Sequence, residues 1–65
     1  DLLRARAFLQ RFDGAGAMTP ESLLLGYRIE TDLGNREQAN RYRTELIQKF
    51  PAAPETAELQ RGRSG

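Results

Sequence analysis

Two stretches of this sequence, 34 positions apart, carry the same helix-opening signals. The stretch that begins at Pro20 and the stretch that begins at Pro54 both continue with glutamate and a hydroxyl residue. Further pairs at this offset are Ala5 with Ala39, Phe8 with Tyr42, Phe12 with Leu46, and Leu25 with Leu59. The matched positions are ones expected to cap a helix or to face a core. Such a repeat predicts supersecondary units that bury their apolar faces by stacking on one another.

Four segments with helical periodicity or helix-boundary residues account for nearly the whole chain, which predicts an all-α fold of antiparallel helical hairpins. The sequence has no valine and no run of alternating polarity, so strand signals are missing. We expect Thr19 to cap the second helix and Gly34 to end it. Asn35, with Gln38 three positions later, should start the third helix at once.

Each of the first three predicted helices has an apolar face that should pack into a core. The predicted faces are Leu2, Ala5, Phe8, Leu9 and Phe12; then Ser22, Leu25, Gly26, Ile29 and Leu33; and then Ala39, Tyr42, Leu46, Ile47 and Phe50. Leu24 and Tyr27 lie outside the second of these faces. The apolar surface of the second helix should therefore be broad enough for two neighbours. A close crossing at Gly26 is expected.

The composition gives little basis for catalysis or for a metal site. The chain has 65 residues, no cysteine and no histidine, so the commonest metal ligands and the commonest general base are missing. A chain of this size buries about 60% of its unfolded surface and offers little room for a carboxylate with a raised pKa. Gly14 and Gly16 form a lone Gly-x-Gly without a preceding strand, which favours a turn. We expect no enzyme activity, cofactor or metal.

Net charge and hydropathy set further limits on partners. The formal net charge is +1, from ten basic and nine acidic residues spread along the chain. Acids at Glu37 and Glu45 flank Arg41, which makes nucleic-acid binding by the third helix the least favoured alternative. No apolar run approaches the roughly 18 residues that a membrane span needs. The abrupt start at Asp1 inside an expected helix suggests a fragment, so any targeting signal is expected upstream in a longer parent chain.

The 34-residue period and the helix pattern resemble the tetratricopeptide family. Leu25, Gly26 and Ile29 match its first helix, and Ala39, Tyr42, Leu46 and Pro51 match its second helix and terminating proline. Leu25 and Gly26 sit one residue further from Gly34 than in the commonest spacing. The resemblance implies that 1–13 is the second helix of a preceding repeat, 19–51 one full repeat, 54–61 a capping helix and 62–65 a frayed tail.

A closer resemblance is to the terminal repeats of the type IV pilus biogenesis and stability lipoprotein family. It is carried by Ser22, Leu23, Leu25, Gly26, Arg28, Ile29, Leu33, Gly34, Tyr42, Leu46, Phe50 and Pro51. The resemblance implies a non-enzymatic scaffold at the periplasmic face of the outer membrane, which helps the pilus secretin to assemble. The alternative is a general tetratricopeptide adaptor of another pathway.

Partner contact is predicted at Leu23, Tyr27 and Glu30, on the side of the second helix that adjoins its core face. The alternative is that these residues pack against a neighbouring helix. Arg43 lies on the apolar face of the third helix and is expected to pair with Glu30 or Asp32, to bind a partner carboxylate, or to keep its guanidinium in solvent. An uncovered apolar flank also makes self-association an expected property.

Overall fold

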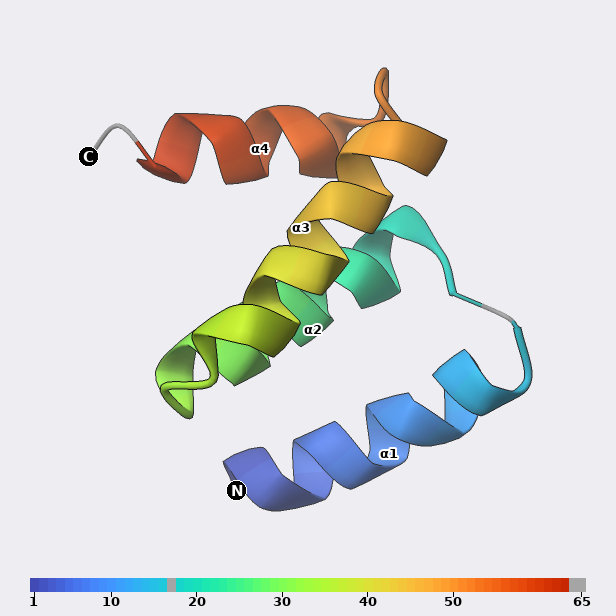
Figure 1. Cartoon of the computed structure of the whole chain (residues 1–65). Helices are drawn as coiled ribbons and strands as arrows, with labels where there is room; N and C mark the ends of the chain where they lie inside the picture. Colours follow the sequence, from blue (N-terminus) through green and yellow to red (C-terminus); the bar gives the residue numbers. More distant parts are fainter. Residues whose placement is uncertain (17, 64–65) are drawn as a thin grey trace.

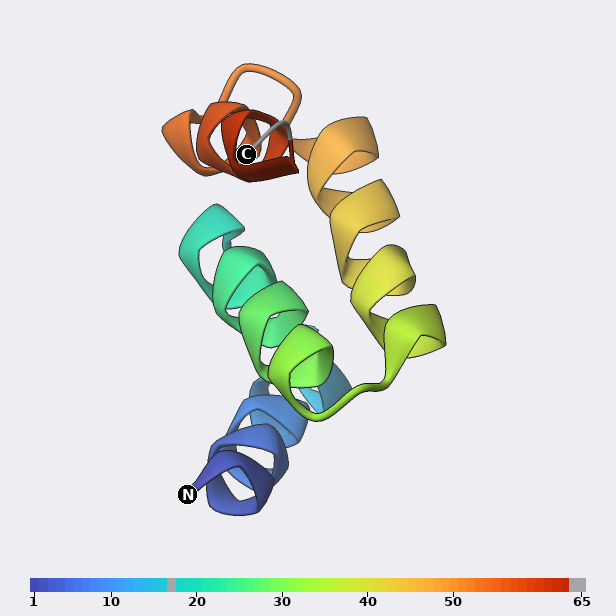
Figure 2. The same ribbon diagram turned by 90° about the vertical axis from the view of Figure 1, so that its left-hand side faces the viewer.

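The computed structural model describes residues 1–16 and 18–63, and within them the chain is all-α, as predicted. The four helices are α1 (Leu2–Gly14), α2 (Pro20–Asp32), α3 (Arg36–Lys49) and α4 (Pro54–Arg63). α2 and α3 form an antiparallel hairpin. α1 lies below α2 and α4 lies above it, in both Figure 1 and Figure 2. α2 is therefore the central helix, and it contacts each of the other three.

The helix ends form as the local sequence predicts. The Thr19 side chain accepts a hydrogen bond from the Ser22 N–H at 3.1 Å, and the Asn35 side chain accepts one from the Gln38 N–H at 3.4 Å. Gly34 has a φ of 80°, which a glycine adopts without a steric cost. The Gly34 N–H donates to the Thr31 carbonyl, and the Asn35 N–H donates to the Glu30 carbonyl, so the α2–α3 turn is a Schellman motif.

The core lies around α2. Its buried apolar side chains are Leu9, Leu23, Leu24, Ile29, Tyr42, Leu46 and Leu59. Gly26 lies where α2 meets both neighbours: a Cβ at this position would be 2.8 Å from the Tyr42 ring and 2.9 Å from Leu9 Cδ2. Only a residue without a side chain lets α1 and α3 approach α2 so closely. The expected close crossing at Gly26 is confirmed.

Two of the predicted core faces are partly wrong. In α2 the side chain of Leu25 is half-exposed, whereas Leu23 and Leu24 are buried. In α1 only Leu9 is buried, and Leu2, Phe8 and Phe12 are exposed. The physical reason is that a hydrophobic arc on one helix does not specify where its neighbours lie. Three helices surround α2, so the buried side of α2 includes Leu23 and Leu24 and not Leu25. α1 contacts α2 through only one edge of its apolar arc.

The outer boundaries differ slightly from those expected. α1 extends to Gly14, one residue beyond the predicted end, and the turn after it contains Gly16 at a φ of 70°. α4 begins at Pro54 as predicted and includes Gly62 and Arg63, which were expected to fray. The remaining residues of that predicted tail, Ser64 and Gly65, lie outside the described residues.

Candidate functional site

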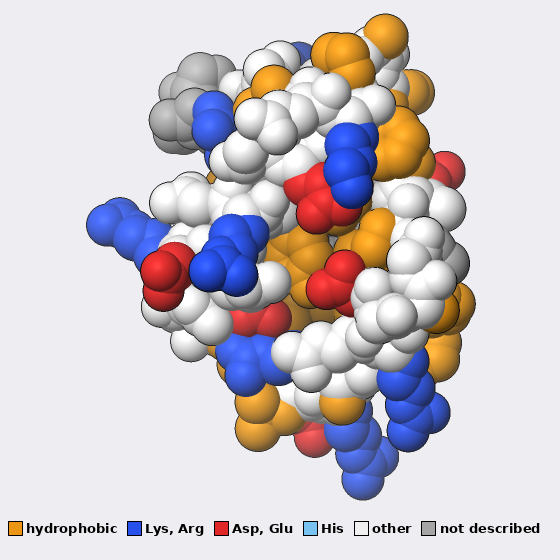
Figure 3. Space-filling view, turned by 45° about the vertical axis from the view of Figure 1, so that its right-hand side comes forward, with side chains coloured by type: hydrophobic (Ala, Val, Ile, Leu, Met, Phe, Trp, Pro, Cys, Tyr) orange, Lys and Arg blue, Asp and Glu red, His pale blue; other side chains and the backbone are white. Residues whose placement is uncertain are grey.

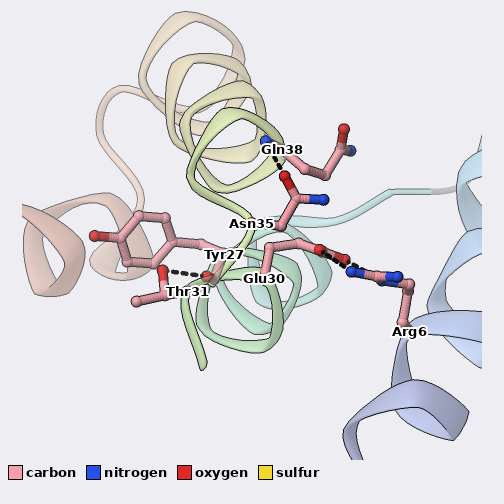
Figure 4. A network of polar contacts seen from close by, with 6 residues as sticks. All are labelled: Arg6, Tyr27, Glu30, Thr31, Asn35 and Gln38. Carbon is pink, nitrogen blue, oxygen red and sulfur yellow. Dashed lines mark hydrogen bonds and ion pairs between the residues drawn. The ribbon is translucent and has the colours of Figure 1, made fainter. Parts of the chain in front are cut away.

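The structure does not bring the three predicted contact residues together on one surface. Leu23 is 0% exposed and belongs to the core, and Glu30 is 2% exposed. Tyr27 alone of the three is partly exposed. In Figure 4 its ring points away from the pair that Glu30 forms with Arg6. The prediction of contact through Leu23 and Glu30 is corrected, because their side chains are covered by the chain's own helices.

Tyr27 lines a hollow of about 400 Å3 where α2 turns into α3. The other lining residues are Thr31, Gly34, Arg36, Ala39 and Asn40. The Thr31 hydroxyl donates to the Tyr27 carbonyl at 2.7 Å, which ties two of the lining residues to each other. The hollow presents an aromatic ring, a guanidinium and an amide. These groups can bind an extended peptide segment with a carboxylate or carbonyl groups.

Glu30 instead forms a two-pronged ion pair with Arg6 of α1. Arg6 Nε lies 3.0 Å from Glu30 Oε2, and Arg6 Nη2 lies 2.8 Å from Glu30 Oε1. These hydrogen bonds raise the pKa of the Arg6 guanidinium above its ordinary value, since they favour its charged form. The planar fork of the guanidinium matches the carboxylate and fixes the register of α1 on α2. Reasoning from the sequence missed this pair.

Arg43 does not form the pair with Glu30 that was one of its predicted alternatives, because Arg6 occupies that carboxylate. The Arg43 side chain is partly buried, and its Nε has no hydrogen-bond partner among the described residues. Arg28, one of the residues that carry the family resemblance, forms an ion pair with Glu58 of α4. Both of these side chains are about half-exposed, so the pair contributes little to stability.

Thr56 joins α4 to the end of α3. Its buried hydroxyl donates to the Phe50 carbonyl at 2.6 Å and lies 3.4 Å from the Leu46 carbonyl oxygen. Leu46 lies in the last turn of α3, where its carbonyl also accepts from the Phe50 N–H, and Phe50 is the residue that caps the helix. The repeat pairs Thr56 with Ser22, but no local sequence pattern predicts this contact between α4 and the end of α3.

The space-filling view in Figure 3 shows a hollowed face with hydrophobic side chains at its floor and both signs of charge at its rim. Over the described residues, no three His, Cys, Asp or Glu side chains come together in a way that could hold a metal ion. None of the helices in the described part of the chain is both long and apolar enough to cross a membrane.

Comparison with known proteins found no relative of this chain. No protein-family model matches the chain, and neither does any curated protein or any solved structure. The fold and its surfaces define an all-α helical hairpin with an added helix at each end.

Proposed function

We propose that this chain is a tetratricopeptide-type scaffold segment that acts by protein–protein contact and not by catalysis. The observation that carries the proposal is the position of α2. It packs antiparallel to α3, contacts α1 before it and α4 after it, and has Gly26 at the close crossing. Helical hairpins that stack with a 34-residue period have the same pattern of helix–helix contacts.

We further propose that the segment belongs to a type IV pilus biogenesis lipoprotein that helps the outer-membrane secretin to assemble. The sequence resemblance at Ser22 to Pro51 motivates this part. Under this proposal the chain works at the periplasmic face of the outer membrane. The lipid anchor would lie outside this sequence.

The partner surface that remains after the burial of Leu23 and Glu30 is the hollow beside Tyr27. Its lining comes from the end of α2, the turn and the start of α3, which the Schellman motif and the Asn35 cap hold in a fixed geometry. A rigid surface of this kind loses little conformational entropy when a partner binds. We propose that Tyr27, Arg36 and Asn40 contact the partner directly.

The test is an affinity pull-down from detergent-solubilised outer membranes of a piliated bacterium, with Tyr27→Glu as the disabling variant. Gln48→Glu is the matched control, because it adds the same negative charge at an exposed α3 position outside the hollow. We expect the secretin to be recovered with the unmodified chain and with the control, and lost with Tyr27→Glu.

Two other results would revise the proposal in different ways. Recovery of a specific partner unrelated to pili, lost with Tyr27→Glu, would overturn the pilus assignment and favour an adaptor of another pathway. Recovery of the secretin with Tyr27→Glu as strongly as with Gln48→Glu would instead overturn the role of the hollow.

A further inference from the structure

Five large hydrophobic side chains of the described chain are exposed, and the 34-residue repeat divides them into two groups. Phe8, Phe12 and Leu25 are 59%, 41% and 50% exposed. Their partners in the repeat are Tyr42, Leu46 and Leu59, which are 4%, 0% and 4% exposed and lie in the core. Three positions that are core positions in one copy of the repeat are therefore uncovered in the other.

The other two exposed leucines behave differently under the same comparison. Leu2 corresponds to Arg36 and Leu3 corresponds to Glu37, and both of these charged residues are exposed. The repeat thus predicts burial for Phe8, Phe12 and Leu25 but not for Leu2 and Leu3. This contrast separates a docking surface from apolar residues that are exposed singly, which need no explanation.

α1 and α3 present different faces to α2. α3 buries Ala39, Tyr42 and Leu46, and Gly26 lets the Tyr42 ring approach the α2 backbone. α1 meets α2 through Leu9 and Arg6, so the face that corresponds to that of Tyr42 stays open. On this open face the Phe8 and Phe12 rings stack edge to face, with centroids 5.1 Å apart. In Figure 3 hydrophobic side chains reach the surface at the lower end of the molecule, where α1 lies.

We propose that Phe8, Phe12 and Leu25 form a docking site for one amphipathic helix of the α2 type. That helix runs antiparallel to α1 and carries glycine or another small residue opposite Phe8, as α2 carries Gly26 opposite Tyr42. The docked helix also covers Leu25, in the same way that α2 and α3 cover the corresponding Leu59 of α4. The inference rests on the repeat architecture proposed above, and it names the chemistry of the segment that completes the stack.

The chain itself supplies a probe for this site. Asp1 corresponds to Asn35, and both cap the helix that follows them: Asp1 accepts from the Leu3 N–H and Asn35 accepts from the Gln38 N–H. A second copy of residues 19–34 placed directly before Asp1 therefore reproduces the α2–α3 connection at the start of α1. The added helix then meets the open face within the same molecule, at a high effective concentration.

The experiment measures the folding equilibrium of the extended chain by urea denaturation, with hydrogen exchange of the α1 amides. We expect the equilibrium constant for folding to rise about tenfold or more, because two phenylalanines and a leucine lose contact with water. Hydrogen exchange of the α1 amides should slow by the same factor. Matched controls are Gly26→Leu in the added copy and Phe8→Ala in α1, which should each abolish the gain, and Leu3→Ala, which should keep it.

Three results would overturn the inference. The first is an extended chain no more stable than its version with Gly26→Leu in the added copy, and the second is a gain that survives Phe8→Ala. The third is a dimer of the unmodified chain that Phe8→Ala dissociates, because the occupant would then be a second copy and not an added helix. The readout is stability alone, so a negative pull-down with the secretin does not affect it.

Discussion

α2 is joined to its two neighbours in the chain by different chemistry. Its interface with α3 is apolar and close, with Tyr42 and Leu46 buried and the Tyr42 ring near Gly26. Its interface with α1 contains one buried leucine, Leu9, and the ion pair between Arg6 and Glu30. The first interface removes much more apolar surface from water than the second.

This difference indicates a division of roles between stability and geometry. Apolar burial contributes free energy roughly in proportion to area, so the α2–α3 hairpin should hold most of the folding free energy. A buried ion pair gains little net free energy, since both charges lose their hydration, but it fixes orientation. α1 is therefore positioned by Glu30 more than it is held by packing, and it should be the first helix to detach.

Shortening a core leucine on either side of α2 tests this division most strongly. Leu46→Ala should lower the free energy of unfolding by about 2–5 kcal/mol, because it leaves a cavity where α3 and α4 meet α2. Leu9→Ala should cost less and should act mainly on α1. Urea denaturation measures the loss of unfolding free energy, and hydrogen exchange shows which helices lose protection. Equal acceleration of exchange in all helices by Leu9→Ala would contradict the division.

Enlarging Gly26 acts on both interfaces at once and should have the next largest effect. Gly26→Leu should cost about 1–3 kcal/mol, since its side chain must displace Tyr42 and Leu9. Gly26→Ala should also destabilise the fold, although alanine favours a helix by about 1 kcal/mol over glycine. Adding Leu9→Ala to Gly26→Ala removes one of the two clashes. If the two changes are simply additive in thermal denaturation, α1 does not press on Gly26.

Breaking the ion pair should have a smaller effect, because Arg6 is partly exposed while Glu30 is buried. Arg6→Leu leaves the Glu30 carboxylate without its partner and should lower the melting temperature. Arg6→Leu combined with Glu30→Leu removes both charges and should be more stable than Arg6→Leu alone. A double-mutant cycle by thermal denaturation measures this coupling. Additive effects of the two single substitutions would show that the pair does not position α1.

The helix boundaries of the hairpin could be predicted from the sequence because their causes are local. Thr19, Gly34 and Asn35 act on backbone groups within a few residues of themselves, and the structure has them in their predicted roles. The terminating proline after α3 and the opening proline of α4 are of the same kind. Such signals depend on the residue type and its position, and no distant segment has to be placed first.

The surfaces could not be predicted in the same way, because their causes lie far apart in the chain. Leu23 and Leu25 are two positions apart and equally apolar, and only the placement of three neighbouring helices decides which one is buried. The pair of Arg6 with Glu30 spans 24 positions and has no local pattern. The hollow beside Tyr27 depends on the turn that follows it. Candidate contact residues chosen from one helix face were therefore mostly core residues.

The smallest expected effect is a loss of stability at alkaline pH that is specific to the α2–α3 interface. Burial raises the pKa of the Tyr42 phenol, because the charged phenolate loses its hydration in the core. The folded state then keeps its proton at pH values where the unfolded chain releases it, so stability is constant below about pH 10 and falls as pH rises further. Phe8, at the corresponding position of α1, has no hydroxyl to titrate.

The measurement is urea denaturation at several pH values from 9 to 11, with Tyr42→Phe as the matched variant. The two proteins differ only in the hydroxyl of this residue, so the difference between their slopes isolates Tyr42. We expect the unmodified chain to lose more stability than Tyr42→Phe across this range. Parallel slopes would mean that the phenol is solvated, and that α3 does not pack on Gly26 as closely as the interface requires. The α2–α3 contact would then resemble the looser α1–α2 contact, and the contrast between the two interfaces would fail.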